Sequence, residues 1–396
     1  MSLDNGEKSK HGYNAQTQLS ELLKFCKDKN YIKEIITNYR IGKSGYKNEE
    51  QFYAPFLVTF FNNESWILFS ATSMRTDRVK GQQWDSYNLK EINHNITKSF
   101  LVYPDGVNNS ELNNFHRQDL KYQEKEEYSA IDAIIDQNKL HDLIEEKATA
   151  NLSKGSIKDL QGRSFEDRIA QCLSNSDNLG IWKRESKTLS GLYYSFFKTI
   201  IDYLGFNHDE IVSINATVDK KVIGKLPTGG NPKTDILVTI NLQKNKYETI
   251  TISCKRSSKD KVSVHEYTAD TFSRVLDVNN RELSKLLHLF QQNPTLSSFG
   301  EENVIKLTSA IAPYKNRLAK WVFAGVGGNG DPNTQWATHI LTYDNNDNTI
   351  SFHSIDEYIK LLNSTHAQGN FGTFFSWTYP SKKRGKSIQL KCKIIK

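Results

Sequence analysis

The sequence predicts an α/β protein in which a mixed β-sheet flanked by helices is preceded by an extra N-terminal α+β domain. Two observations carry this prediction. After residue 154, short β-branched and apolar runs alternate with helical patterns, whereas strand-like runs bounded by Asn, Gly and Pro fill much of the earlier part. A small, polar segment at 151–156 places the boundary between domains 1–153 and 154–396.

Composition narrows the class of protein. The composition, with 37% hydrophobic and 24% charged residues, is that of an ordinary globular protein. A length of 396 residues is enough for more than one hydrophobic core. The formal charge of +7 suits a polyanionic partner without identifying it. The sequence has no long apolar run, so we expect no membrane span, no signal peptide and a cytoplasmic location. Four cysteines without metal-ligand spacing predict neither a zinc site nor a disulfide framework.

The N-terminal domain alternates helical and strand-like patterns. The predicted elements are a helix at 17–27, a helix or strand at 31–39, a hairpin within 52–70, a strand at 98–103 and an amphipathic helix within 131–144.

A polar stretch between two of these strands, residues 73–84, is predicted as a loop. Its Arg, Lys, Gln and Trp side chains are of the kinds that contact phosphates, base edges or stacked bases. The candidates for DNA binding are Arg75, Arg78, Lys80, Gln82, Gln83 and Trp84. The alternative is a solvated loop whose arginines pair with Asp77 and Asp85.

The C-terminal domain begins with helical patterns and continues with strands. The predicted helices cover 164–173 with Ser164 as N-cap, 190–204, 264–273, 282–290, 302–318 with a break before Pro313, and 355–362. The predicted strands cover 236–240, 247–253, 321–324, 337–343 and 349–353. The glycine loop at 325–330 lacks the Gly-Lys-Ser/Thr of a P-loop, and His265 is expected on the surface.

Residues 228–267 contain the main candidate for a catalytic site, because a predicted hairpin that turns near Lys244 brings an acid and a lysine together. Asp235 at the start of one strand lies opposite Ser253 and Lys255 at the end of the other, and the last two share a face. A carboxylate that binds Mg²⁺ beside a lysine that orients water is the arrangement used for metal-assisted phosphodiester hydrolysis. The alternative is a strand pair with an exposed Asp and Lys.

Two further segments are candidates for DNA contact. Ser257, Ser258 and Lys259 follow the hairpin, where they either bind backbone phosphate or form a solvated turn. Seven of the last fifteen residues are basic and none is acidic, which is typical of a DNA-binding segment or of a solvated tail. Its candidates are Thr378, Tyr379, Ser381, Lys382, Lys383, Gln389 and Lys391.

Several blocks together resemble a known family. Pro232-Lys233-Thr234-Asp235 with Ser253-Cys254-Lys255 is similar to the PD-(D/E)xK nuclease core, with Ser in the D/E slot. With the block 371–391, it resembles the MspI family of type II restriction endonucleases over residues 156–391. The resemblance implies a restriction-endonuclease-like fold, Mg²⁺, double-stranded DNA as substrate, a short site such as CCGG and a cognate DNA methyltransferase. It also makes Glu166 a candidate metal-site residue, although a first-turn acid favoured by the helix dipole is the alternative.

The chain departs from the family at one catalytic position and in its length. The family has Asn where this chain has Ser253, and the first 150 or so residues have no counterpart in the resemblance. Two alternatives therefore stay open: a DNA-binding protein with a degenerate nuclease core, and a modification-dependent nuclease.

Overall fold

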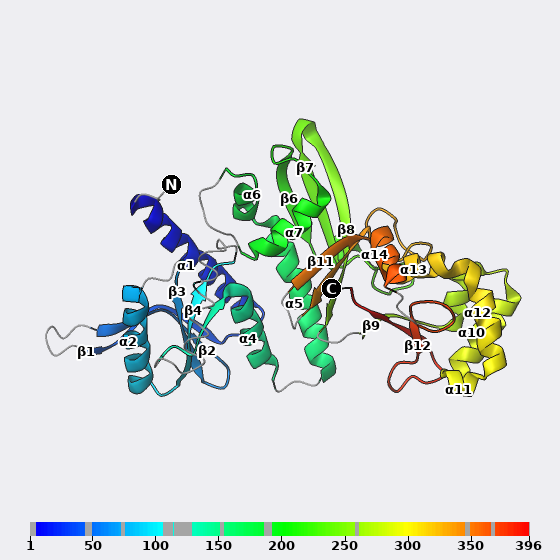
Figure 1. Ribbon diagram of the computed structural model, residues 1–396, viewed down its shortest axis with the longest axis horizontal. Coiled ribbons are helices and arrows are strands. Elements are labelled where there is room, and N and C mark those ends of the chain that lie inside the picture. Colours follow the sequence, from blue (N-terminus) through cyan, green and yellow to red (C-terminus); the bar gives the residue numbers. More distant parts are fainter. Residues whose placement is uncertain are drawn as a thin grey trace. The chain divides into compact units, whose positions relative to one another are not determined.

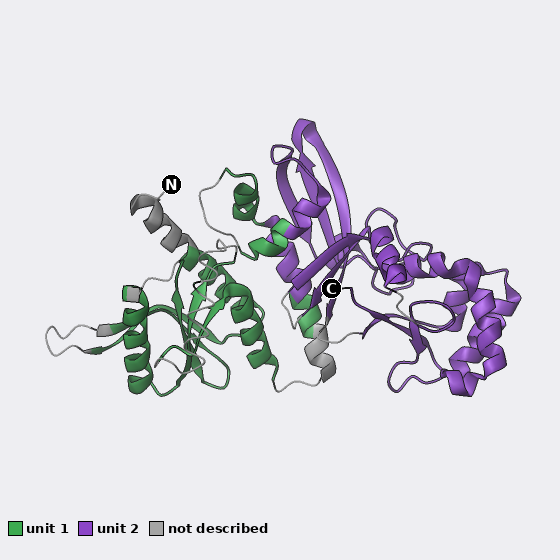
Figure 2. Cartoon of the chain, in the orientation of Figure 1, with its two compact units in different colours: residues 1–164, 175–198 green, residues 165–174, 199–396 purple. Residues whose placement is uncertain are grey.

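The computed structural model describes residues 5–43, 50–72, 76–105, 114, 129–150, 154–185, 192–257, 261–344, 349–365 and 369–395. The chain forms two compact units, shown in Figure 2. Unit 1 comprises residues 1–164 and 175–198, and unit 2 comprises residues 165–174 and 199–396. Two helices, α5 (Lys154–Ser174) and α7 (Tyr194–Leu204), contain residues of both units. The predicted boundary at 153/154 falls directly before α5.

Unit 1 contains a sheet with the strand order β1-β2-β3-β4-β5 (Figure 1). The first three strands pair antiparallel, and β3, β4 and β5 pair parallel. The strands are β1 (Glu34–Lys43), β2 (Glu50–Thr59), β3 (Ser65–Ser70), β4 (Ile96–Tyr103) and β5 (Ala133–Asp136). The predicted hairpin within 52–70 and the strand at 98–103 are confirmed, and the ambiguous stretch at 31–39 enters a strand.

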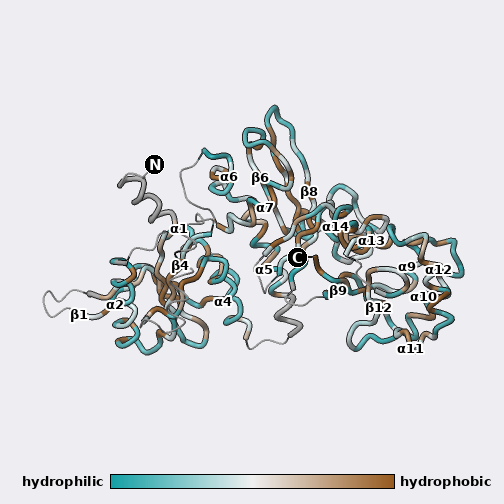
Figure 3. The backbone as a smooth tube through the Cα atoms, viewed as in Figure 1, coloured by the Kyte–Doolittle hydropathy of each residue, from teal (hydrophilic) through white to brown (hydrophobic). Residues whose placement is uncertain are grey.

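Four further helices lie among the described residues of unit 1. They are α1 (Asn5–Asp28), α2 (Thr76–Ile92), α4 (Gln137–Thr149) and α6 (Ser176–Trp182). Of these, α1, α2 and α4 pack on the sheet. Val79 and Leu89 of α2 join Ile67 and Leu101 of the sheet in one hydrophobic core. In Figure 3 the tube is brown along β4 and largely teal along α2, as expected for a sheet covered by amphipathic helices.

Two predictions for unit 1 are wrong. Residues 76–84 belong to helix α2 rather than to a loop. Tertiary packing of Val79 and Leu89 stabilises this helix, although its apolar residues are sparse and Gly81 lies in its middle. The amphipathic helix predicted within 131–144 is split, since residues 133–136 form β5 and the helix begins only after Asp136, whose side chain accepts a hydrogen bond from the Lys139 N–H.

Unit 2 contains a larger sheet with the order β11-β10-β8-β7-β6. Strands β10 and β8 are parallel, and the other neighbours are antiparallel, so the sheet is mixed, as predicted. The strands are β6 (Ile211–Thr217), β7 (Ile236–Leu242), β8 (Lys246–Ser257), β10 (His339–Asp344) and β11 (Thr349–Ser354). Lys244 and Asn245, both with φ near +60°, make the turn between β7 and β8, and Figure 3 shows this tip as hydrophilic.

A second, smaller sheet of unit 2 has the antiparallel order β12-β13-β9. Its strands are β12 (Ser376–Thr378), β13 (Ile388–Lys393) and β9 (Lys261–Tyr267). It shares one hydrophobic core with most of the surrounding helices. The helices of unit 2 are α8 (Lys220–Ile223), α9 (Ala269–Asp277), α10 (Arg281–Gln292), α11 (Leu296–Phe299), α12 (Glu301–Ile311), η2 (Ala312–Tyr314), α13 (Lys315–Ala324) and α14 (Ile355–Ser364).

Several predictions for the C-terminal domain need correction. Ser164 is not an N-cap, because α5 starts ten residues earlier and Ser164 is buried within it. Residues 264–267 belong to strand β9, and the helix begins at Ala269 with Thr268 as its N-cap. The predicted strand at 321–324 is the end of helix α13, which Gly325 terminates in a left-handed conformation by donating to the Trp321 carbonyl at 2.8 Å.

Candidate active site

The β7–β8 hairpin brings the predicted catalytic residues together. Ile236 pairs with Ile252, and the Asp235 N–H donates to the Ile252 carbonyl at 2.8 Å, which places Asp235 beside Ser253. Strand β7 begins at Ile236, so its pairing with β8 does not extend to Cys254. The Asp235 carboxylate instead accepts from the Cys254 N–H at 2.8 Å.

Lys255 completes a short network on the same face. Its Nζ donates to the Ser253 Oγ at 3.0 Å and to the Cys254 carbonyl at 2.7 Å, and it lies 3.7 Å from the Asp235 Oδ2. The Ser253 Oγ lies 3.4 Å from the same Oδ2. Ser253 itself is buried, whereas the side chains of Lys255 and Asp235 are 19% and 21% exposed. The acid and the lysine can therefore reach a substrate from a fixed position.

Glu166 on helix α5 lies close enough to this network to interact electrostatically with Asp235 and Lys255. Burial and the neighbouring Asp235 carboxylate raise the pKa of Glu166 to about 8, although the nearby Lys220 and Lys255 oppose the shift. A side chain that interacts with Asp235 in this way is not merely a solvated acid at a helix start. Glu166 also lies within α5 and not in its first turn, so the helix-dipole alternative is wrong.

The two carboxylates suit a magnesium ion. Mg²⁺ binds through one or two carboxylates and keeps several waters or substrate oxygens as its other ligands. Within the part of the chain that the structure describes, no three His, Cys, Asp or Glu side chains gather into a group that could hold a metal. The residues that would hold the ion are the two carboxylates, Asp235 and Glu166, and Lys255 lies beside Asp235.

Two lysines that the sequence analysis did not single out also interact electrostatically with the site. Lys220 interacts with Glu166, and Lys233 interacts with Asp235 and Lys255. Burial, assisted by the Lys255 charge, lowers the pKa of Lys233 to about 7, and its Nζ donates to the Val264 carbonyl at 2.8 Å. Lys233 belongs to the motif that ends in Asp235, which is the only signal in the sequence that points to it.

His265 is not on the surface, contrary to the prediction. It is 4% exposed, and its ring lies 4.0 Å from the Trp321 ring and 4.5 Å from the Tyr267 ring. Burial lowers its pKa well below the ordinary value, with a smaller contribution from Lys233. His265 is therefore a neutral member of the core behind β9.

The C-terminal candidates lie on the smaller sheet and on the turn between its strands β12 and β13. Thr378 pairs with Gln389, and Ser376 pairs with Lys391. Gln389 and Lys391, the two residues predicted to contact base edges, therefore lie on one sheet. Along β13, half-buried Gln389 and Lys391 alternate with buried Ile388, Leu390 and Cys392, which confirms that the two share a face.

The turn between β12 and β13 carries the other candidates. Ser381, Lys382 and Lys383 are exposed, and Tyr379 stacks with Arg384 at 5.6 Å. Lys383 already forms an ion pair with Glu266 at 2.8 Å, so its charge is partly compensated.

The remaining candidates divide into described and undescribed residues. On α2, Arg78 and Lys80 are exposed, as is 61% of Trp84, which has an edge contact with Phe52. Gln82 and Gln83 are half-buried on the same helix. Asp85 accepts from the Tyr53 N–H at 3.3 Å. Ser257 ends strand β8, while Ser258, Lys259 and Arg75 lie outside the described residues.

A mixed sheet brings an acid, a serine and a lysine together on adjacent segments, and comparison with known proteins places the chain in the class of the type II restriction endonucleases. The chain belongs to the MspI restriction endonuclease family, whose model matches residues 140–392.

Individual relatives agree with this assignment. The chain is 30% identical to the type II restriction enzyme BsuFI of Bacillus subtilis, over 99% of both chains. It is 22% identical to the type II restriction enzyme MspI of Moraxella sp, over 60% of this chain and 91% of that one. A crystal structure of MspI in complex with its cognate DNA matches with a TM-score of 0.53 and 21% identity, covering 64% of this chain and 98% of the other. The likeness to BsuFI extends over the N-terminal region that the MspI match leaves out. No helix among the described residues is long and apolar enough to cross a membrane.

Proposed function

We propose that the protein cuts double-stranded DNA at a short, CCGG-like site by Mg²⁺-dependent hydrolysis of phosphodiester bonds. The observation that carries this proposal is the network of Asp235, Ser253 and Lys255, in which a carboxylate and an ammonium lie 3.7 Å apart at a partly exposed strand end. The relatives are named type II restriction enzymes, and one solved structure holds cognate DNA. A cognate DNA methyltransferase acting on the same site and a cytoplasmic location follow from this function as further parts of the proposal.

Asp235 and Glu166 would hold the ion, which supplies charge to polarise the phosphate and acidify a water. Lys255 is fixed by Ser253 and the Cys254 carbonyl, so its ammonium stays beside the reacting phosphate without reorganisation. There it orients the attacking water and offsets the charge that develops on phosphate oxygens. The attacking water gives up a proton to the solvent as its oxygen bonds to phosphorus, one P–O ester bond breaks, and the departing oxygen takes up a proton.

The exposed basic segment after β12 and the Gln389–Lys391 face of β13 would bind the duplex. Lys382 and Lys383 are suited to phosphate, whereas Gln389 and Lys391 alternate onto one face and can reach base edges. Thr378, Tyr379 and Ser381 flank the same surface. Ser257, Ser258 and Lys259 would contact the backbone near the cut.

The N-terminal domain, residues 1–153, would extend recognition rather than assist the chemistry. On α2, Arg78 and Lys80 are exposed beside Trp84, which fits contact with phosphates and an exposed base. An Arg78→Ala, Lys80→Ala double variant of the full chain should change the protected sequence or the affinity for DNA. Unchanged footprints and an unchanged cutting preference would assign α2 a structural role only.

A second candidate is a DNA-binding protein with a degenerate nuclease core. It is favoured by Ser253, which supplies no carboxylate in the second position of the motif. Glu166 weighs against it, because it brings a second acid to Asp235 from another element.

Incubation with methylated and unmethylated plasmid, with and without Mg²⁺, separates these functions. We expect Mg²⁺-dependent cutting of unmethylated DNA, and sequencing of the fragment ends identifies the site. Binding without cutting would indicate the degenerate core, and cutting of methylated DNA alone would indicate a modification-dependent nuclease.

A further inference from the structure

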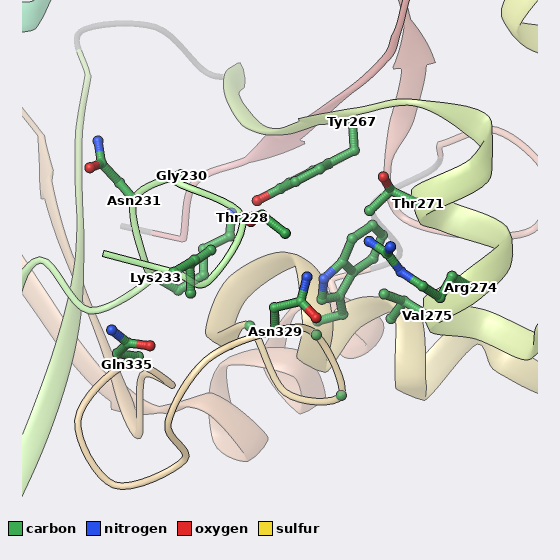
Figure 4. Close-up of a pocket in the computed structure, with 15 residues that line it drawn as sticks. Thr228, Gly230, Asn231, Lys233, Tyr267, Thr271, Arg274, Val275, Asn329 and Gln335 are labelled. Carbon is green, nitrogen blue, oxygen red and sulfur yellow. The ribbon is translucent and has the colours of Figure 1, made fainter. Parts of the chain in front are cut away.

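A cavity of about 400 Å³ opens beside the catalytic hairpin within unit 2 (Figure 4). Its walls come from the loop that leads to Asp235, which includes Lys233, from Tyr267 at the end of β9, from α9, from Trp321 on α13 and from the glycine loop after α13. The volume lies within the range of small-ligand sites. Because Lys233 precedes Asp235 by two residues, the cavity is adjacent to the proposed reaction centre without including its network.

The charge of the cavity is positive. None of the residues that line it is Asp or Glu, whereas Arg274 is a cation and Lys233 is a base whose pKa is lowered to about 7 by burial. The Lys233 ammonium is held by the Val264 carbonyl at 2.8 Å, a neutral partner. Arg274 is exposed on α9 and makes no hydrogen bond or ion pair with another described residue. The lining therefore holds the positive charge of Arg274 without an acidic residue of its own to balance it.

A neutral hydrogen-bond donor, the Tyr267 hydroxyl, accompanies Arg274 in the lining. The Tyr267 hydroxyl points across the cavity toward Thr228 in Figure 4, and it has no hydrogen-bond partner among the described residues. The wall behind it is closed: Trp321 is 4% exposed, and Gly328 packs so tightly that a Cβ there would lie 2.8 Å from the indole nitrogen. A bound group would meet charge and hydroxyl donors on one side and an aromatic edge on the other.

The carboxamide in this wall has a structural role. The Gln335 Nε2 donates to the Ile223 and Lys225 carbonyls at 3.1 and 3.2 Å, and its Oε1 accepts from the Asp331 N–H at 3.0 Å. With its amide occupied in this way, Gln335 does not read a base edge. The groups that stay available, the Arg274 guanidinium and the Tyr267 hydroxyl, can donate hydrogen bonds. The lining therefore favours an anion over a nucleobase.

We propose that this cavity is a binding site for a phosphate group, and that the phosphate is one of the DNA backbone close to the bond that is cut. This inference rests on the proposed function, because the same duplex must reach Asp235. Arg274 at the rim would pair with the phosphate oxygens, and Tyr267 would donate a hydrogen bond from within. Contact here holds the strand so that the next phosphate lies at the Asp235–Lys255 network.

The test compares Arg274→Gln with a matched control, Arg281→Gln, an exposed arginine of α10 that does not line the cavity. Binding of the full chain to CCGG-containing and random duplexes is measured in Ca²⁺ over a series of salt concentrations. Loss of one phosphate contact should lower the slope of log K against log salt by about 0.9 and weaken both duplexes alike. Arg281→Gln should leave the slope unchanged, and Arg274→Lys should restore most of it.

A scan of single methylphosphonate substitutions in the duplex locates the phosphate. The wild-type protein should lose affinity when the phosphate at one particular position is replaced. The Arg274→Gln variant should bind the duplex substituted at that position as well as the unsubstituted duplex. An unchanged slope for Arg274→Gln, or equal sensitivity at all positions, overturns the proposal. Binding of inorganic phosphate that depends on Arg274, seen by ³¹P NMR while the DNA slope is unchanged, would make the ligand a free anion and also overturn it. Wild type that binds neither duplex would contradict the proposed function instead.

Discussion

Replacing Ser253 by Asp tests directly whether this buried position faces a metal ion. Its hydroxyl lies 3.0 Å from the Lys255 Nζ and 3.4 Å from the Asp235 Oδ2. A new carboxylate there would be attracted by the lysine and repelled by the acid. At an effective dielectric constant near 20, two unit charges about 4 Å apart interact by about 4 kcal/mol, so the two interactions nearly cancel.

The stability of the Ser253→Asp variant is therefore decided by the cost of burying the new carboxylate and by its repulsion from Glu166. We expect the metal-free variant to lose about 1–3 kcal/mol of unfolding free energy. If the position faces the ion, Mg²⁺ gains a ligand, and saturation at a hundredfold excess over Kd restores about 2.7 kcal/mol. DNA cleavage should be retained.

The assay is denaturant unfolding of wild type, Ser253→Asp and the uncharged control Ser253→Asn, each in EDTA and in Mg²⁺. Both variants should still cut DNA, and only Ser253→Asp should gain Mg²⁺-dependent stability beyond that of wild type. Equal Mg²⁺ effects in all three proteins, or loss of cleavage in both variants, would refute the assignment of this position to the metal site.

Three further changes probe DNA recognition and the core. Gln389→Ala should cost specific affinity by about 1–3 kcal/mol and spare random DNA, and equal losses on both would make it a phosphate contact. Lys382→Ala should weaken all sequences alike in a salt series, and a selective loss on the cognate site would contradict this. Burial lowers the pKa of His339 to about 4, below its ordinary value, so the unfolded state binds the proton first as the pH falls. Denaturant unfolding should therefore show about 2 kcal/mol less stability at pH 5 than at pH 7.5, and His339→Gln should lose much of that dependence; an unchanged dependence would show that other groups cause it.

Local patterns predicted the catalytic hairpin well. Its two strands consist of β-branched and apolar residues around a polar turn at Lys244, so propensity, pattern and turn chemistry agree. The alternation of Gln389 and Lys391 with apolar neighbours likewise fixed their common face.

Predictions failed where distant residues decide the structure. Helix α2 has few apolar residues, and its packing on Ile67 and Leu101 is invisible in its own sequence. The run at Trp321 has strand-like residues, but Gly325 ends it as a helix. The burial of His265 depends on aromatic residues from α9 and α13, and the approach of Glu166 to Asp235 depends on how α5 packs on the sheet.

We propose that Asp235 belongs to a metal-dependent nuclease centre and not to the DNA-binding surface. The most direct measurement compares Asp235→Ala with wild type for plasmid cleavage in Mg²⁺ and for duplex binding in Ca²⁺. We expect cleavage to fall by at least about a thousandfold while binding stays within a few-fold, because the change removes a metal ligand and leaves the basic surface intact. Cleavage near the wild-type rate, or loss of binding in proportion to loss of cleavage, would contradict the claim.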